Sequence, residues 1–325
     1  MMICFSEFRS ARVAWAAARL ALGGLALTPL AGAPAIADDD VQSRRIRIEY
    51  APPKSPEIEP YYQLVMQRKA LEKVQELFSP LMLPSEITVR TTECGISNAW
   101  YQRPTVSICY EYLRDVIDMA PKAPSRDGIT PYDAVLGQFL FTAAHEMGHA
   151  VFDLLDVPIF GRPEDAADQF AAYILLRIGK QDARKLIEGA AYMYKDYVGR
   201  PTVTVPVTAF ADVHGAPMQR FYDLLCVGYG ADSEMFAALV DYLPKARVPG
   251  CKTEYGEVNF AFQKLIEPHV DQNLKNEVLS KTWVPADNAP PPRLSDLPQA
   301  KQGGASSENV PQSLKSQDAP ASSLR

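Results

Sequence analysis

The 325-residue chain has few of the residues that build metal and redox sites: four histidines and five cysteines. It also has no long run of basic residues, and its formal net charge is −6. Proteins that bind nucleic acid need a basic surface for the phosphates, so this charge balance argues against a nucleic-acid partner. With 47% hydrophobic residues, the sequence nevertheless holds enough apolar side chains for a sizeable folded core.

A long uninterrupted apolar segment is missing as well. The first 37 residues contain three arginines, then the run LALGGLALTPLAG, then the small-x-small sequence AIA just before Asp38. This order is typical of a cleaved signal peptide, and the glycines and proline inside the apolar run argue against a permanent span, although an uncleaved anchor is the alternative. We expect residues 1–37 to be removed and the protein to be exported to the periplasm or secreted, without stable membrane insertion.

The last segment, residues 284–325, is rich in proline, serine, glutamine and glycine and has almost no aromatic residues. Such a composition cannot bury enough apolar surface to offset the entropy of the chain. We therefore predict a disordered polar tail that follows a domain at residues 38–283.

The few cysteines agree with export. Cys4 lies in the predicted signal, which leaves Cys94, Cys109, Cys226 and Cys251. An even number in an oxidising compartment indicates disulfides. Three pairings are possible; we favour Cys94–Cys109 and Cys226–Cys251 because each closes a short loop, and four buried thiols are the alternative. No pair has the spacing of a zinc knuckle, which argues against a cysteine metal site.

Hydrophobic periodicity predicts an α+β fold, with a small mixed sheet followed by a mostly helical part. Alternating patterns predict strands, and spacings of three and four residues predict helices. The predicted strands are 45–50, 86–93, 97–102 and 105–110. The predicted helices are 61–78, 110–120, 132–155, 163–178, 181–196, 217–229, 231–243 and 257–280, with an irregular or strand-like segment at 199–217.

The longest predicted helix carries the sequence His145-Glu146-Met147-Gly148-His149. Residues four apart lie on one face of a helix, with Cβ atoms roughly 5–6 Å apart, so both imidazoles can reach one zinc ion. Glu146 lies beside them, where it can take a proton from an activated water. The alternative is a chance match in a buried helix, but two histidines and a glutamate there would be costly to bury without partners.

A catalytic zinc needs a third protein ligand. The next predicted helix begins with Glu164 and Asp165, and Glu164 and Asp168 are one helical turn apart. We expect Glu164 to bind the metal and Asp168 to accept a hydrogen bond from a ligand imidazole. Two alternatives stay open: Asp165 is the ligand, or the acidic cluster only caps the helix.

H-E-x-x-H followed by E-x-x-x-D resembles the gluzincin group of zinc peptidases, of which thermolysin is the familiar member. The segments HEMGHAVFDLLDVPIFGRPEDAADQFAA and QRFYDLLC are similar to a family of exported bacterial proteins of unknown function to which metallopeptidase activity is attributed. This resemblance covers most of residues 45–283 and implies a zincin-like fold with one zinc ion. The gap from His149 to Glu164 is shorter than in thermolysin, which keeps Asp165 as an alternative ligand.

The resemblance implies two further roles. NAWY, which begins at Asn98 and Ala99, is similar to the edge strand on which gluzincins lay a peptide; a plain edge strand is the alternative. His214, in ADVHGAP, matches a histidine that stabilises the oxyanion, and a surface-loop histidine is the alternative. Arg220 could hold Asp168, Glu164 or a substrate carboxylate, and a structural ion pair is the favoured role. His269 is expected to be a surface residue.

Two functions of different classes follow. The first is a zinc peptidase that hydrolyses a peptide or protein substrate, with Glu146 as general base. The second is a catalytically inactive zinc-binding envelope protein that uses the same scaffold for protein binding. Glu146 discriminates between them, because a protein that only binds metal has no need of a carboxylate at that position.

Overall fold

The structure is a computed structural model that describes residues 45–124, 128–194 and 210–284. The predicted signal peptide, nearly all of the predicted polar tail and most of the segment 199–217 lie outside these residues. Within them the fold is α+β, with a small mixed sheet followed by a mostly helical part, as predicted.

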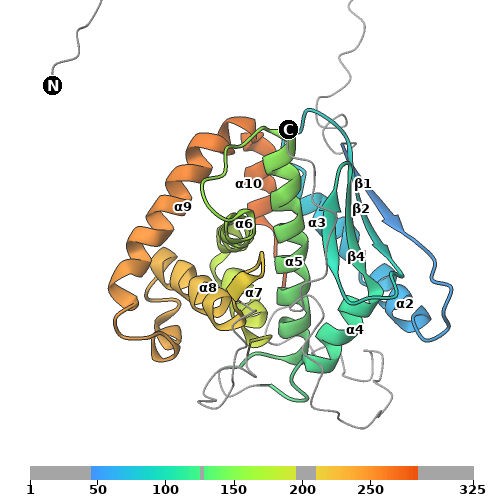
Figure 1. The fold of residues 1–325 in the computed structure, drawn as a ribbon, viewed down its shortest axis with the longest axis horizontal. Coiled ribbons are helices and arrows are strands. Elements are labelled where there is room, and N and C mark those ends of the chain that lie inside the picture. The colour runs from blue at the N-terminus through green and yellow to red at the C-terminus, as the bar shows by residue number, and fades with distance from the viewer. Residues whose placement is uncertain (1–44, 125–127, 195–209, 285–325) are drawn as a thin grey trace, which may run out of the picture. The chain divides into compact units, whose positions relative to one another are not determined.

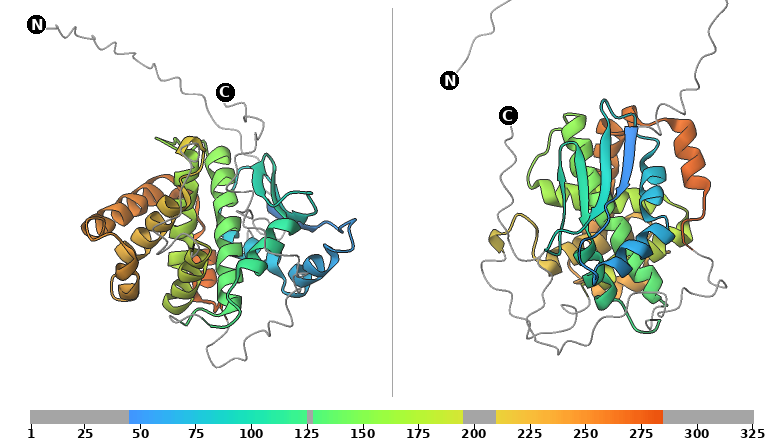
Figure 2. Two further views of the ribbon diagram at one scale, coloured as in Figure 1. Left: turned by 60° about the horizontal axis from the view of Figure 1, so that its bottom comes forward. Right: turned by 90° about the vertical axis from the view of Figure 1, so that its right-hand side faces the viewer.

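Four short strands form one sheet in the order β1-β2-β4-β3 (Figure 2). They are β1 (Ile46–Tyr50), β2 (Ile87–Thr92), β3 (Ala99–Gln102) and β4 (Thr105–Cys109). Strand β2 pairs in parallel with both β1 and β4. Strand β3 pairs antiparallel with β4 and forms an edge of the sheet. Side chains of β2 alternate between buried and half-buried, as expected of a strand with one face on the core.

Three helices come from the same part of the chain as the sheet: α2 (Glu59–Gln67), α3 (Ala70–Phe78) and α4 (Tyr110–Met119). The prediction of one helix over 61–78 was wrong, because the chain breaks at Lys69, whose φ of 50° lies in the left-handed region. After this break α3 contacts β1 and β2, and it buries Leu71, Val74 and Phe78. The burial of these apolar side chains offsets the strain of the left-handed residue.

The helix α5 (Pro131–Leu154) lies between the sheet and the remaining helices (Figure 1). Its start is fixed by Thr130, which accepts a hydrogen bond from the amide of Asp133, while the Asp133 side chain bonds back to Thr130. Such reciprocal bonds satisfy amides that a helix start otherwise leaves unpaired. One side of α5 contacts β3 and β4, and it also contacts α6 and α7.

The helical part consists of α6 (Pro163–Arg177), α7 (Lys180–Tyr192), α8 (Pro217–Ala231), α9 (Cys251–Leu265) and α10 (Gln272–Ser280). The prediction of a helix over 231–243 was partly wrong, since this segment forms a 3-10 helix, Ala237–Tyr242, in place of an α-helix. The predicted helix 257–280 is interrupted by the short turn Glu267–His269 and by an isolated bridge between Leu81 and Val270. Pro268 has no amide hydrogen to continue α9, so the break has a local cause.

Glycines allow α5 to pack closely against its neighbours. A Cβ atom added at Gly137 would lie 2.6 Å from the Leu186 carbonyl oxygen of α7. One added at Gly148 would lie 3.0 Å from Cδ1 of Phe170 on α6. Since real Cβ contacts are longer, glycine at these positions sets how near α6 and α7 come to the metal-motif helix.

Two disulfides join neighbouring elements: Cys94–Cys109 links the segment before β3 to the end of β4, and Cys226–Cys251 links α8 to α9. These are the pairs favoured from the sequence. Their presence is compatible with an exported protein. None of the helices in the described ranges combines the length and the apolarity that a bilayer crossing requires.

Candidate metal centre

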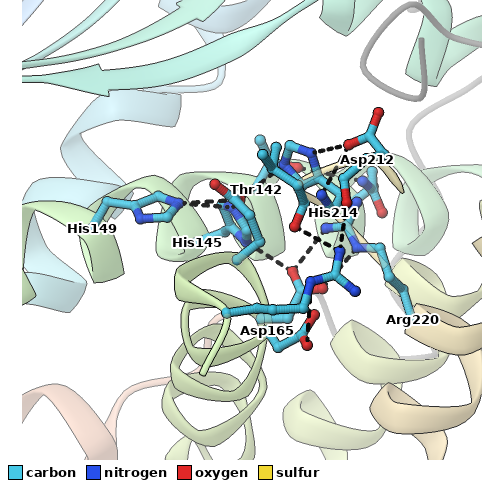
Figure 3. A network of polar contacts seen from close by, with 12 residues as sticks. Thr142, His145, His149, Asp165, Asp212, His214 and Arg220 are labelled. Carbon is cyan, nitrogen blue, oxygen red and sulfur yellow. Dashed lines mark hydrogen bonds and ion pairs between the residues drawn. The ribbon is translucent and has the colours of Figure 1, made fainter. Parts of the chain in front are cut away.

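His145 and His149 lie side by side on α5 (Figure 3), and their ligand atoms and that of Glu164 on α6 all lie within 4.8 Å of one another. Nε2 of His145 lies 3.2 Å from Nε2 of His149, and Glu164 Oε2 lies 3.0 and 3.3 Å from these two nitrogens. Ligands that surround one zinc ion tetrahedrally at about 2.0–2.1 Å are about 3.3–3.4 Å from each other. The three atoms therefore form a triangle of the size that one zinc ion needs, and a vertex remains for a further ligand.

The hydrogen bonds of His145 give an independent reason for a cation here. Its Nδ1 lies 2.7 Å from Asp168 Oδ1 and donates to that carboxylate. In a neutral imidazole Nε2 then carries a lone pair, and this lone pair faces the Glu164 oxygen at 3.0 Å. Two acceptors that face each other repel, and a metal ion or a proton between them removes the repulsion. The donor set thus fits a divalent cation.

The same contacts shift the pKa values of the cluster. Burial lowers the pKa of His145, but the hydrogen bonds to Asp168 and Glu164 outweigh burial and raise it to about 10 in the metal-free protein. Burial favours the neutral form of Glu164, yet the three histidines around it hold its pKa far below the usual range. Because a metal ligand must be deprotonated, the cation and a proton compete for His145.

Asp168 joins the metal triangle to a second charged group, Arg220 of α8. Arg220 donates from Nε to Asp168 Oδ2 and from Nη2 to Asp168 Oδ1, each at 2.7 Å. Burial acts to raise the pKa of Asp168, but Arg220 and His145 hold it well below its usual range. This fork of two hydrogen bonds fixes the carboxylate that orients the His145 ring.

His214 (Figure 3) lies on the segment before α8, and its ring contacts the same glutamate. Its Nε2 is 2.9 Å from Glu164 Oε2, and its Nδ1 is 3.3 Å from Asp212 Oδ1. The Asp212 carboxylate also accepts from the His214 amide at 2.9 Å. The ring is thus held next to the Glu164 oxygen that belongs to the metal triangle.

Glu146 is 7% exposed and follows His145 directly on α5. Glu164 and Asp168 are occupied by histidines and by Arg220, whereas no hydrogen bond or ion pair joins the Glu146 carboxylate to another residue of the described ranges. A buried carboxylate without such a partner retains its acceptor capacity for water or for a substrate.

The two acidic residues at the start of α6 lie differently. Glu164 contacts the histidines, whereas Asp165 Oδ2 lies 3.8 Å from Nε of Arg162. The Asp165 carboxyl also lines a small cavity of about 20 Å³ with Asp168, Arg220 and their neighbours. Of the two carboxylates considered as third ligand, the structure therefore brings Glu164 to the triangle.

The edge strand β3 lies against the metal helix α5. Tyr101 donates to Asp153 Oδ2 at 2.7 Å, and Arg103 donates to both carboxylate oxygens of Asp153 at 2.6 and 2.7 Å. Asp153 is one turn after His149, so these bonds hold the strand in a fixed position along the metal helix. At the start of the strand, Asn98 Oδ1 accepts from the Ala99 amide at 2.9 Å.

Three contributors to the centre were missed by the sequence reasoning. Asp153 follows the motif by one helical turn, a spacing that could have pointed to it. Asp212 stands two residues before His214, which is the spacing of a local side-chain turn. Arg162 donates from Nη2 to the carbonyl oxygens of Asp212 and Val213 at 2.9 and 2.7 Å. No local sequence pattern predicts the contact of Arg162 with Asp212, which are fifty residues apart.

Comparisons with known proteins agree with this chemistry. No curated protein and no solved structure matches the chain. A family model described as "Putative metallopeptidase" matches residues 50–266, which include every residue of the metal triangle. Since this match covers more than half of the chain, the protein belongs to that metallopeptidase family.

Proposed function

We propose that this protein is a zinc-dependent peptidase that hydrolyses peptide bonds, with one zinc ion held by His145, His149 and Glu164. The observation that carries the proposal is the triangle of ligand atoms with sides of 3.0, 3.2 and 3.3 Å. Zinc bound there would supply Lewis-acid polarisation of a carbonyl group and would activate water as the nucleophile. Membership of the metallopeptidase family supports this class of reaction.

Glu146 is proposed as the general base. Its side chain is buried beside His145 and has no partner in the described ranges, so its lone pairs can accept the proton of the attacking water. The same carboxyl group then delivers the proton to the leaving amine. General acid–base catalysis of this kind contributes about 10²–10⁴-fold to the rate.

His214 and the edge strand complete the proposed mechanism. The His214 ring lies 2.9 Å from the third ligand, so it can donate a hydrogen bond to the oxygen that gains charge in the transition state. The edge strand that begins at Ala99 lies against α5, and an extended peptide can pair with such an edge through backbone hydrogen bonds. Asp168 and Arg220 fix the orientation of His145.

Export to the periplasm or beyond the cell is part of the proposal. It is supported by the signal-like first 37 residues and by the two disulfides, which persist in oxidising compartments.

The catalytic proposal is tested by Glu146→Gln, with Glu257→Gln as the matched control because Glu257 is exposed on α9. Each purified protein is loaded with zinc and assayed on casein and on a quenched peptide library. We expect Glu146→Gln to lose about 10²–10⁴-fold in activity with an unchanged zinc content, and the control to match the parent. A Glu146→Gln protein as active as the parent would show the mechanism to be wrong.

The ligand set is tested separately by metal analysis. Zinc content of the parent is compared with that of Glu164→Ala and Asp165→Ala, which are neighbours of similar charge. We expect Glu164→Ala alone to lose zinc. Loss of zinc in Asp165→Ala alone would give the role of third ligand to Asp165, and a parent free of zinc would end the proposal.

A further inference from the structure

We propose that the free edge of strand β1 is a dimerisation surface, at which a second copy of this chain pairs its own β1 in antiparallel register, centred on Ile48. The inference goes beyond the proposed function, because it concerns the other end of the sheet. Strands β1 and β3 lie at opposite ends of the four-stranded sheet (Figure 2). A dimer joined at β1 therefore leaves β3 of both copies open to a substrate.

The backbone of β1 has one side that pairs with β2 and one side that points away from the sheet. The amide of Ala51, directly after the strand, donates to the carbonyl oxygen of Thr91 in β2 at 3.0 Å. Backbone groups of successive residues in a strand point to opposite sides, so the odd-numbered residues of β1 face β2. The even-numbered residues direct their N–H and C=O groups outward, toward the open edge.

This outward row is largely unoccupied. Gln75 of α3 donates from Nε2 to the Ile46 carbonyl oxygen at 2.5 Å, in agreement with the outward direction of that group. Within the described part of the chain, neither the N–H nor the C=O of Ile48 has a hydrogen-bond partner, and β1 pairs with no strand besides β2. Such a row of unpaired donors and acceptors is a template on which another strand can add.

The side chains of β1 indicate that the added strand is another β1. Arg47 and Glu49 are exposed on one face of the strand, and Ile48 is half-buried on the other. When two copies run antiparallel with Ile48 opposite Ile48, Arg47 of each copy lies opposite Glu49 of the other. Residues directly opposite have Cβ atoms about 4.5–5.5 Å apart, and opposite charges at this distance stabilise the pair.

The charges also select this register. A shift by two residues in one direction brings Arg47 opposite Arg47, and a shift in the other direction brings Glu49 opposite Glu49, which is repulsive in both cases. A shift by one residue would set outward backbone groups against inward ones. Antiparallel pairing of identical strands has a two-fold axis, so it ends at a closed dimer and does not continue into a fibre.

Both charged side chains are available for a partner. No ion pair joins Glu49 to another residue of the described ranges, and Arg47 Nε lies 2.8 Å from Glu86 Oε2. The side chains of this pair are 69% and 45% exposed, so the bond between them contributes little and Arg47 can turn to Glu49 of the second copy. Pro52 and Pro53 limit the pairing to five residues, and we therefore expect a weak, reversible dimer.

The experiment measures the dissociation constant of the dimer by sedimentation equilibrium of the full mature chain, from about 1 μM to 1 mM. Arg47→Glu makes every facing charge negative, and Glu49→Arg makes every facing charge positive. The double variant with both substitutions exchanges the charges and keeps them complementary. Two controls are matched to Arg47→Glu: Glu86→Gln removes the same ion pair outside β1, and Lys264→Glu on exposed positions of α9 makes the same change in net charge.

We expect the parent and both controls to dimerise alike, and each single variant to have a dissociation constant at least about tenfold higher. An equimolar mixture of the two single variants should dimerise as tightly as the parent, and so should the charge-exchanged double variant. Recovery in the mixture also shows that the single variants are folded.

Three results would overturn the proposal: a parent that is monomeric at every concentration, a single variant that dimerises like the parent, or a mixture of the single variants that stays monomeric. Sedimentation does not depend on turnover. The fate of the dimer is therefore decided separately from that of the peptidase, which the Glu146→Gln assay decides.

Discussion

The substitution Asp168→Asn tests how the metal triangle is held in place. Asp168 is bonded to His145 Nδ1 on one side and to Arg220 by a fork on the other, with all three contacts at 2.7 Å. Asparagine has nearly the same shape, so the change removes the negative charge and adds an amide NH₂ without leaving a cavity.

Two separate consequences are expected. First, Arg220 keeps its positive charge in a buried position, where the side chain is 15% exposed, and loses its counter-charge. Breaking such a buried pair costs about 3–5 kcal/mol. For a domain of this size that cost lowers the melting temperature of the metal-free protein by roughly 6–20 °C.

Second, the tautomer of His145 changes. The amide NH₂ can donate to Nδ1, which leaves the hydrogen of a neutral ring on Nε2, the atom proposed to bind zinc. Loss of such an orienting carboxylate typically costs 10–100-fold in metal affinity, so we expect zinc binding to weaken by about that factor. Competition with a chromophoric chelator measures it.

A second variant separates the two effects. Asp168→Asn combined with Arg220→Met removes the unpaired charge, so stability should return to within about 1–2 kcal/mol of the parent while zinc affinity stays low. Urea unfolding of the metal-free proteins with intact disulfides gives the stabilities. A single variant that unfolds like the parent, or a double variant that regains zinc affinity, would refute this account of the network.

Three further predictions follow from the same geometry. Gly148→Ala should weaken zinc binding about tenfold in a chelator competition, because the added Cβ, 3.0 Å from Phe170, displaces α6 and with it Glu164. A second substitution, Phe170→Leu, should restore the zinc affinity. Arg162→Ala should lower kcat on a peptide about tenfold with unchanged zinc content, because the loss of the Arg162 hydrogen bonds frees the segment that carries His214. A variant with the full activity of the parent would contradict this role of Arg162. Chelation with EDTA should lower the melting temperature. Zinc added back at 100 times its Kd should raise the free energy of unfolding by about 2.7 kcal/mol, and Glu164→Ala should reduce this stabilisation.

Much of the site could be predicted because it is local. The two histidines and Glu146 lie within five residues of one helix, so the helical repeat alone places them together. Asp168 follows Glu164 by one turn for the same reason. The choice between Glu164 and Asp165 is different, since adjacent residues of a helix point about 100° apart. Which of them faces α5 depends on how α5 and α6 pack, and that is a long-range property.

The fold class was predicted correctly from the periodicity, but three helices, those predicted at 61–78, 231–243 and 257–280, were not delimited correctly. No glycine or proline marks the break at Lys69, where the burial of α3 on the sheet outweighs local preference. The His214 segment was identified only through a family resemblance. Its position depends on Arg162 and Asp212, and the first of these contacts spans fifty residues, beyond the reach of any periodic pattern.

The contact between Gly148 and Phe170 has a consequence for how this family can vary. In the motif H-E-x-x-H the residue before the second histidine can be any amino acid, yet here Gly148 is constrained by its contact with Phe170 of α6. Phe170 also takes part in a group of stacked rings with Phe78 and Phe262, so a bulkier residue at 148 would require a smaller one at 170 and a rearrangement of that aromatic group. Positions 148 and 170 are therefore expected to change together, as a linked pair, among descendants of this sequence.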